Sequence, residues 1–110
     1  MDKFIGGLRW GNAFWNDAGV YGNATFPLAN LKIVNNNCIL TWSFWWLKST
    51  SYVLPFKDIN YVTIESFLFN KGILFVHTNK DIPKYLLFWT FHPVKVCNSL
   101  KSHGIKVVKP

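Results

Sequence analysis

The groups that could serve as general acids or bases are few and far apart in this 110-residue chain. Its five carboxylates stand at widely separated positions: Asp2, Asp17, Asp58, Glu65 and Asp81. Acid–base catalysis requires groups that converge on one reacting atom, and no spacing in the sequence brings two of these together. Asp58 is predicted to bond backbone amides at a turn, and Glu65 to lie on the solvent face of its strand. The sequence therefore predicts no catalytic carboxylate pair.

Histidines and cysteines show no metal-binding or nucleophilic pattern either. His77, His92 and His103 are well separated, and neither H-x-x-x-H nor C-x-x-C occurs. Cys97 is predicted to lie on the apolar face of a helix, where cysteine acts as a small hydrophobic residue rather than a nucleophile. No glycine-rich phosphate loop leads from a strand into a helix. We therefore predict a non-enzymatic protein with no metal, no cofactor and no small-molecule substrate.

Composition indicates binding and narrows the choice of partner. Twelve basic residues against five acidic ones give a formal net charge of +7, which favours anionic lipids, nucleic acid or an acidic protein surface. The lysines are scattered without a block of like charge, so the simplest interpretation is a solvated basic surface. Six Trp and ten Phe exceed what one small core needs, so we expect some rings at an interface.

The compartment is predicted from the cysteines and from the start of the chain. Cys38 and Cys97 lie far apart in sequence, and the first residues lack the pattern of a signal peptide. The longest uncharged stretch, 33–47, contains three asparagines and falls short of the roughly 20 apolar residues of a spanning helix. We expect a cytoplasmic protein with reduced, buried thiols, and any membrane contact would be peripheral.

Residues 1–23 differ in composition from the rest of the chain. They contain five glycines interleaved with asparagines, which indicates a loop-rich segment, yet they also carry several large aromatic rings. We predict that 1–23 form an aromatic and Gly-rich arm that packs on the domain or on a neighbouring subunit. The remaining residues, 24–110, are predicted to form one domain.

From residue 24 onward, short apolar runs alternate with turn residues. Runs rich in β-branched and aromatic residues predict strands at 25–34, 38–46, 52–56, 59–69, 73–77 and 85–91, the last of them apolar on both faces. The first run is expected to be interrupted near Pro27, because proline cannot donate to a central ladder. Asparagines at 35–37 suit a turn with left-handed backbone.

After Pro93 the apolar period changes from that of a strand to that of a helix. Val94, Cys97 and Leu100 share one predicted face, with Val96 beside them, and Gly104 is a natural left-handed cap. The sequence therefore predicts a mainly β (α+β) fold. It consists of a strongly bent antiparallel sheet, or partly open barrel, capped by one C-terminal helix from about Pro93 to His103.

This order of elements over 24–105 resembles the pleckstrin-homology-like superfold, and within it the GRAM and bacterial PH-like modules. The resemblance is carried by the run 31–40, by the step Leu54-Pro55-Phe56-Lys57-Asp58-Ile59, by the hairpin 72–76, by 86–88 and by the helix ending Leu100-x-x-x-Gly104. It implies a non-catalytic PH-like binding module. Phosphoinositide-binding members carry basic residues in the loop between their first two strands, whereas 35–37 here are all asparagine.

The favoured partner is another protein or peptide, self-association included. The residues predicted to make contacts are Trp45, Trp46 and Lys48 in one loop region, followed by Trp10, Phe14 and Trp15 in the arm. Adjacent Trp45 and Trp46 point to opposite faces of a strand, so at least one of them must be exposed or covered by the arm.

Two other classes of partner are compatible with the charge and the aromatic residues. Peripheral binding to anionic membrane lipids is the alternative, with Trp45 and Trp46 inserting beside Lys48, because tryptophan prefers the membrane interface and lysines are attracted to anionic headgroups. Single-stranded nucleic acid could stack on aromatic rings interleaved with lysines. The presence of only one arginine, Arg9, and the lack of an RNP-like motif argue against nucleic acid.

Overall fold

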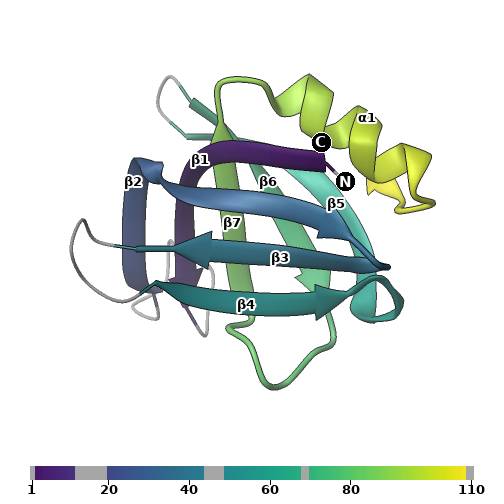
Figure 1. Cartoon of the computed structure of the whole chain (residues 1–110), viewed down its shortest axis with the longest axis horizontal. Helices are drawn as coiled ribbons and strands as arrows, with labels where there is room; N and C mark the ends of the chain where they lie inside the picture. Colours follow the sequence, from purple (N-terminus) through teal and green to yellow (C-terminus); the bar gives the residue numbers. More distant parts are fainter. Residues whose placement is uncertain (1, 12–19, 44–48, 68–69, 109–110) are drawn as a thin grey trace.

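The computed structural model describes residues 2–11, 20–43, 49–67 and 70–108, and for 20–27, 66–67 and 70 the description covers the backbone. The strands and the helix follow one another along the chain (Figure 1). In order they are β1 (Asp2–Gly11), β2 (Val20–Val34), β3 (Asn37–Trp42), β4 (Thr50–Pro55), a 3-10 turn (Phe56–Asp58), β5 (Ile59–Phe67), β6 (Asn70–His77), β7 (Tyr85–Thr90), α1 (Pro93–Ser102) and β8 (Val107–Val108).

The strands form one curled sheet, a half-barrel, in the order β4-β3-β2-β1-β7-β6-β5-β8. All neighbours are antiparallel except the short β8, which runs parallel to β5. Helix α1 lies across one end of the half-barrel, beside the first half of β1 (Figure 1). The predicted class, a bent and mainly antiparallel sheet capped by one C-terminal helix, is confirmed.

Strand β1 lies inside the sheet, which corrects the predicted boundary between an arm of 1–23 and a domain of 24–110. Residues 2–11 pair with β2 on one side, and Gly7–Gly11 pair with β7 on the other. The glycines that indicated a loop are instead contact points: a Cβ on Gly6 would collide with the Trp89 carbonyl oxygen, and one on Gly7 with the Trp89 ring. They let β7 approach β1 closely.

Strand β2 is bent where its pairing with β1 is irregular. Gly6 pairs with Ala29 whereas Leu8 pairs with Ala24, so a two-residue step on β1 faces a five-residue step on β2. Extra residues in one strand bend it and increase its twist. Pro27 lies within this interval, which agrees with the interruption predicted from its missing N–H.

Backbone of positive φ occurs at two turns of the described chain, and the residue types explain both. Asn35 and Asn36 have φ values of 51° and 61° and join β2 to β3, as expected for asparagines in a two-residue hairpin loop. Gly104, with φ of 86°, donates its N–H to the Lys101 carbonyl at 2.9 Å and ends α1. Both predicted turns are confirmed.

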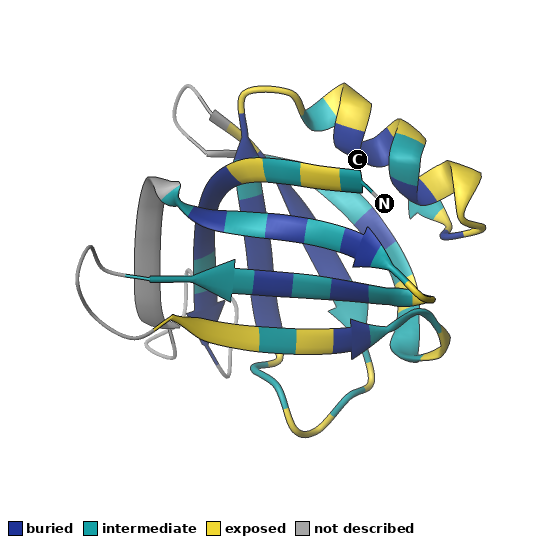
Figure 2. Cartoon of the chain, viewed as in Figure 1, coloured by how far each residue is buried: buried dark blue, intermediate teal, exposed yellow. Residues whose placement is uncertain are grey.

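The core lies between the concave face of the sheet and α1 (Figure 2). Strand residues of alternating position meet three helix residues there: Leu8, Leu31, Ile33, Cys38, Leu40, Leu54, Val62, Ile73, Phe75, Leu86 and Phe88 from the sheet, with Val96, Cys97 and Leu100 from α1. On the other face of β7, Tyr85 and Leu87 form a second buried cluster with Leu74. Strand β7 is thus apolar on both faces, as predicted.

Val94 departs from the predicted helix face. It is 64% exposed, although Cys97 and Leu100 are buried as expected. Val96 is also buried, which moves the centre of the buried arc away from Val94. At about 100° of rotation per residue, Val94 lies about 110° from the centre of the arc formed by Val96, Cys97 and Leu100. The side chain therefore extends beside the core rather than into it.

Candidate functional site

Most of the residues predicted to make contacts lie outside the described part of the chain. They are Phe14 and Trp15 within 12–19, and Trp45, Trp46 and Lys48 within 44–48.

Trp10 is the one predicted contact residue within the description, and it is buried. Its side chain is 9% exposed and stacks on Trp42, with ring centroids 4.4 Å apart and ring planes inclined by 22°. Tyr52 lies beside the same ring at 6.4 Å. Trp10 faces the core because it alternates with Gly11 and Arg9 on a central strand, so its surface role is corrected to a packing role.

Within the described ranges, the cysteines and the other potential metal ligands do not gather at one place. Cys38 and Cys97 are free and buried, and no group of three or more His, Cys, Asp and Glu in the described residues could hold a metal ion. Burial raises the pKa of Cys38 to about 12. Burial also raises the pKa of Cys97, although nearby Lys101 opposes the shift. Both groups are therefore neutral thiols at neutral pH.

We expect these thiols to be unreactive in the folded protein. At pH 8, a thiol-specific reagent such as Ellman's reagent should label neither cysteine in native protein, because the thiolate is the nucleophile. Both should react at once after unfolding in guanidinium. Rapid labelling of Cys97 in native protein would instead indicate an accessible thiolate on α1.

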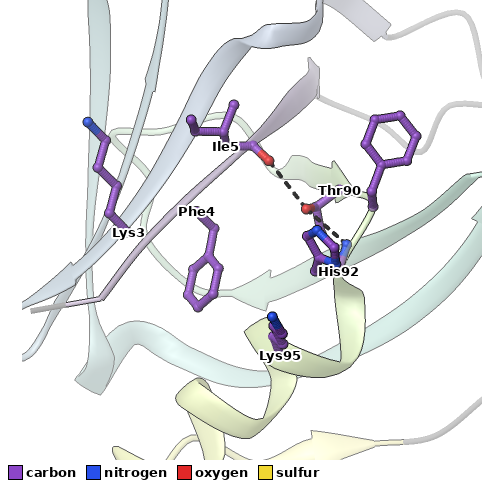
Figure 3. Close-up of a pocket in the computed structure, with 7 residues that line it drawn as sticks. Lys3, Phe4, Ile5, Thr90, His92 and Lys95 are labelled. Carbon is purple, nitrogen blue, oxygen red and sulfur yellow. Dashed lines mark hydrogen bonds between the residues drawn. The ribbon is translucent and has the colours of Figure 1, made fainter.

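A cleft opens between the first half of β1, the end of β7 and the start of α1. Its volume is about 460 Å³, and it is lined by Lys3, Phe4, Ile5, Thr90, Phe91, His92 and Lys95 (Figure 3). We call it the β1–α1 cleft. Residues from both ends of the sequence therefore build one surface feature, which the central position of β1 makes possible.

The edge of β1 that faces this cleft carries no strand. Strand β7 pairs with β1 only from Gly7 to Gly11, whereas Asp2–Gly6 pair with β2 alone. The Ile5 carbonyl accepts a hydrogen bond from the Thr90 hydroxyl at 3.3 Å, so the backbone groups of Ile5 face away from β2. Along a strand the backbone N–H and C=O groups of successive residues point to opposite sides, so residues two positions apart point to the same side. The N–H and C=O of Lys3 therefore also face the cleft. Among the described residues, no strand pairs with them.

Three hydrogen bonds, at two points along β1, hold α1 and the end of β7 against it. At one end Thr90 Oγ1 donates to Ile5 and accepts the N–H of His92 at 3.3 Å. At the other end the Ser99 hydroxyl donates to the Asp2 carboxylate. These bonds bracket Lys3 and Phe4 along β1. The short open edge is therefore held in a fixed position relative to the helix.

The surface around the cleft is both apolar and basic. Of the four large hydrophobic side chains that are exposed in the described residues, two line it, Ile5 at 53% and Phe91 at 62%, and a third, Val94 at 64%, precedes the lining residue Lys95 in the chain. Lys3 and Lys95 are exposed there as well. The first turn of α1 contains no acidic residue and no side-chain cap. Exposed apolar side chains gathered at one place are typical of an interaction surface.

Side chains divide between the two faces of the β1 edge. Figure 3 shows the Phe4 ring on the side of β1 toward α1 and Lys95, whereas Lys3 and Ile5 extend from the opposite side. Phe4 is half-buried and packs against the core, so it forms an apolar floor. The cleft thus offers backbone groups at its edge, an apolar floor and cationic side chains at its margins.

Sequence reasoning missed this cleft. It placed Val94 on the buried helix face and assigned Phe91 to the end of a strand, whereas β7 ends at Thr90. One signal was available in the sequence: the apolar residues Phe91 and Val94 stand on either side of Pro93. Residues that flank a change from strand to helix cannot all face one core, so some of them were to be expected at the surface. The position of Ile5 beside them depends on a strand pairing that no local pattern predicts.

Comparison with known proteins adds no relative: no protein-family model, curated protein or solved structure matches the chain. The single α-helix of the described residues is too short to cross a membrane.

Proposed function

We propose that the chain is a non-catalytic PH-like, GRAM-like module that binds a protein or peptide partner through the β1–α1 cleft. The element order supports the PH-like assignment, because two antiparallel meanders, β1–β4 and β5–β7, precede one C-terminal helix. Two buried free thiols support a reducing compartment such as the cytoplasm.

The observation that carries this proposal is the gathering of exposed apolar side chains at an unpaired strand edge. Aromatic residues are enriched at protein interfaces, and Phe91 is 62% exposed beside the cleft. Backbone groups on an open edge can pair with an extended segment of another chain. A protein ligand uses both features, since it buries apolar side chains and supplies backbone donors and acceptors.

A random-peptide display library tests this function on the full chain. Selected peptides should bind the wild-type protein and lose affinity by about tenfold on Phe91→Ser, the loss expected for an interface anchor. Val53→Ser is the matched control, because Val53 is 48% exposed but lies on the edge strand β4, three strands away from β1 in the sheet. Failure to select any peptide, or equal losses for the two variants, would contradict the proposal.

Peripheral binding to an anionic membrane is a second candidate, favoured by one feature of the same surface. Phe91 and Val94 are exposed next to Lys95, and an aromatic ring beside a lysine suits the interface of an anionic bilayer. Sedimentation with phosphatidylserine vesicles at low salt tests it. Binding that is reduced by Phe91→Ser and not by Val53→Ser would support this candidate, and absence of sedimentation would exclude it.

A further inference from the structure

We infer that the partner of the β1–α1 cleft is an acidic, extended peptide segment that adds as a strand to the edge of β1 at Lys3–Ile5. This inference rests on the proposed function and specifies the chemistry of its ligand. Its acidic side chains would face Lys3, and its apolar side chains would cover Phe4.

The backbone geometry selects an extended ligand. The N–H and C=O of Lys3 and the N–H of Ile5 face the cleft, by alternation from the bond between Ile5 and Thr90. A strand placed along this edge would continue the sheet and pair with these groups. The edge extends over three residues, or about 10 Å at the rise of a strand. The contact is therefore a short segment rather than a folded domain face.

The charges around the edge select an acidic ligand. Lys3 stands directly opposite Lys32 in the register of β1 and β2, and like charges at such positions repel each other. Lys95 supplies a further positive charge from α1. None of the residues lining the cleft is acidic, and nearby Asp2 already accepts the Ser99 hydroxyl. A carboxylate beside Lys3 would relieve the repulsion between the two lysines.

Net charge also argues against a second copy of this chain as the occupant. Two chains of formal charge +7 repel each other, and the edge in question is itself basic. The edge of β5 is already occupied by β8, with Val62 paired to Val107. At the β4 edge the strand itself, Thr50–Pro55, contains no charged residue, and the nearest described lysine, Lys57, lies in the turn after it, so no lysine stands along that strand as Lys3 does on β1.

The two faces of the edge set the pattern of the ligand. Lys3 and Ile5 project from one face of β1 and Phe4 from the other, toward α1 (Figure 3). An added strand alternates in the same way, so its residues beside Lys3 point outward and its residue beside Phe4 points toward the helix. Outward carboxylates and inward apolar side chains complement these two faces. The expected ligand therefore alternates acidic and apolar residues.

End-blocked peptides titrated into the ¹⁵N-labelled full chain provide the test. A peptide alternating glutamate with valine should shift the backbone amides of residues 3–6, 91–92 and 94–95. The same peptide with lysine in place of glutamate should not bind, and N-methylation of alternate amides should weaken binding by about tenfold. Lys3→Glu should weaken binding by about tenfold, whereas Lys80→Glu, an equal change of charge at an exposed position of the 78–84 loop, should leave it nearly unchanged.

Each contrary result overturns a defined part of the inference. Equal binding of the lysine peptide would remove the acidic specificity, and no effect of N-methylation would remove strand addition. Changes in amide chemical shift confined to β4 would show that the peptide binds at β4 rather than at the β1–α1 cleft. If library peptides bind in a Phe91-dependent way while the glutamate–valine peptide does not, only this inference fails. If no peptide binds but anionic vesicles do so through Phe91, both the peptide ligand and the proposed protein partner are excluded.

Discussion

Gly6→Ala is expected to lower the free energy of unfolding by about 3 kcal/mol, the upper range for overpacking a core. An added Cβ would meet the carbonyl oxygen of Trp89 and would lie 2.9 Å from the Phe88 ring. The carbonyl belongs to the backbone of β7, so no side-chain rotation can relieve the clash. Strands β1 and β7 would have to separate, although this pairing joins the two meanders of the sheet. Equilibrium unfolding in urea measures the change.

Two other glycines give matched controls for this prediction. At Gly104 a Cβ would meet nothing within 4 Å, so Gly104→Ala should cost only about 1 kcal/mol, from its φ of 86°. Gly72→Ala should fall between the two, because its nearest atoms, at 2.8 Å, belong to the movable Leu87 side chain. If Gly6→Ala were no more destabilising than Gly104→Ala, β7 could not pass this close to β1.

These glycines also explain where sequence reasoning about the fold succeeded and where it failed. Between residue 24 and the helix each strand has an apolar run and each turn has its own residue types, so local patterns were sufficient there, although the short β8 was not predicted. In β1 the glycines have the composition of a loop, but Gly6 and Gly7 are required by residues of β7 about 80 positions later in the chain. A constraint between such distant residues leaves no local trace, so the strand was assigned to an arm.

The candidate site was harder to predict than the fold, for a related physical reason. Hydrophobicity indicates which residues can form a core. Which of these residues are instead exposed depends on how the fold packs them. Trp10 was expected at the surface and is buried against Trp42, whereas Val94 was expected to be buried and is exposed. The unpaired edge at Lys3 exists only because β7 stops pairing with β1 at Gly7. The pairing of β1 with β7 is therefore shorter than its pairing with β2, and this difference depends on the three-dimensional arrangement of the strands.

Leu100→Ala is expected to destabilise the protein by about 3 kcal/mol, within the usual range for truncating a buried leucine. Leu100 is fully buried and is one of three residues, with Val96 and Cys97, through which α1 contacts the core. A ten-residue helix is not stable by itself and depends on such packing. Because domains of this size are stable by only about 5–15 kcal/mol, unfolding in urea should detect the loss easily.

Val94→Ala on the same helix separates packing from helix formation. Val94 is 64% exposed, so its truncation should change the free energy of unfolding by less than about 0.5 kcal/mol. Because α1 supplies Lys95 to the cleft, loosening the helix by Leu100→Ala should also weaken binding of the glutamate–valine peptide, even where the protein remains folded. Retention of full peptide affinity in folded Leu100→Ala protein would mean that the docked helix does not form the wall of the site. Equal destabilisation by the two variants would mean that α1 contributes intrinsic helix stability rather than core packing.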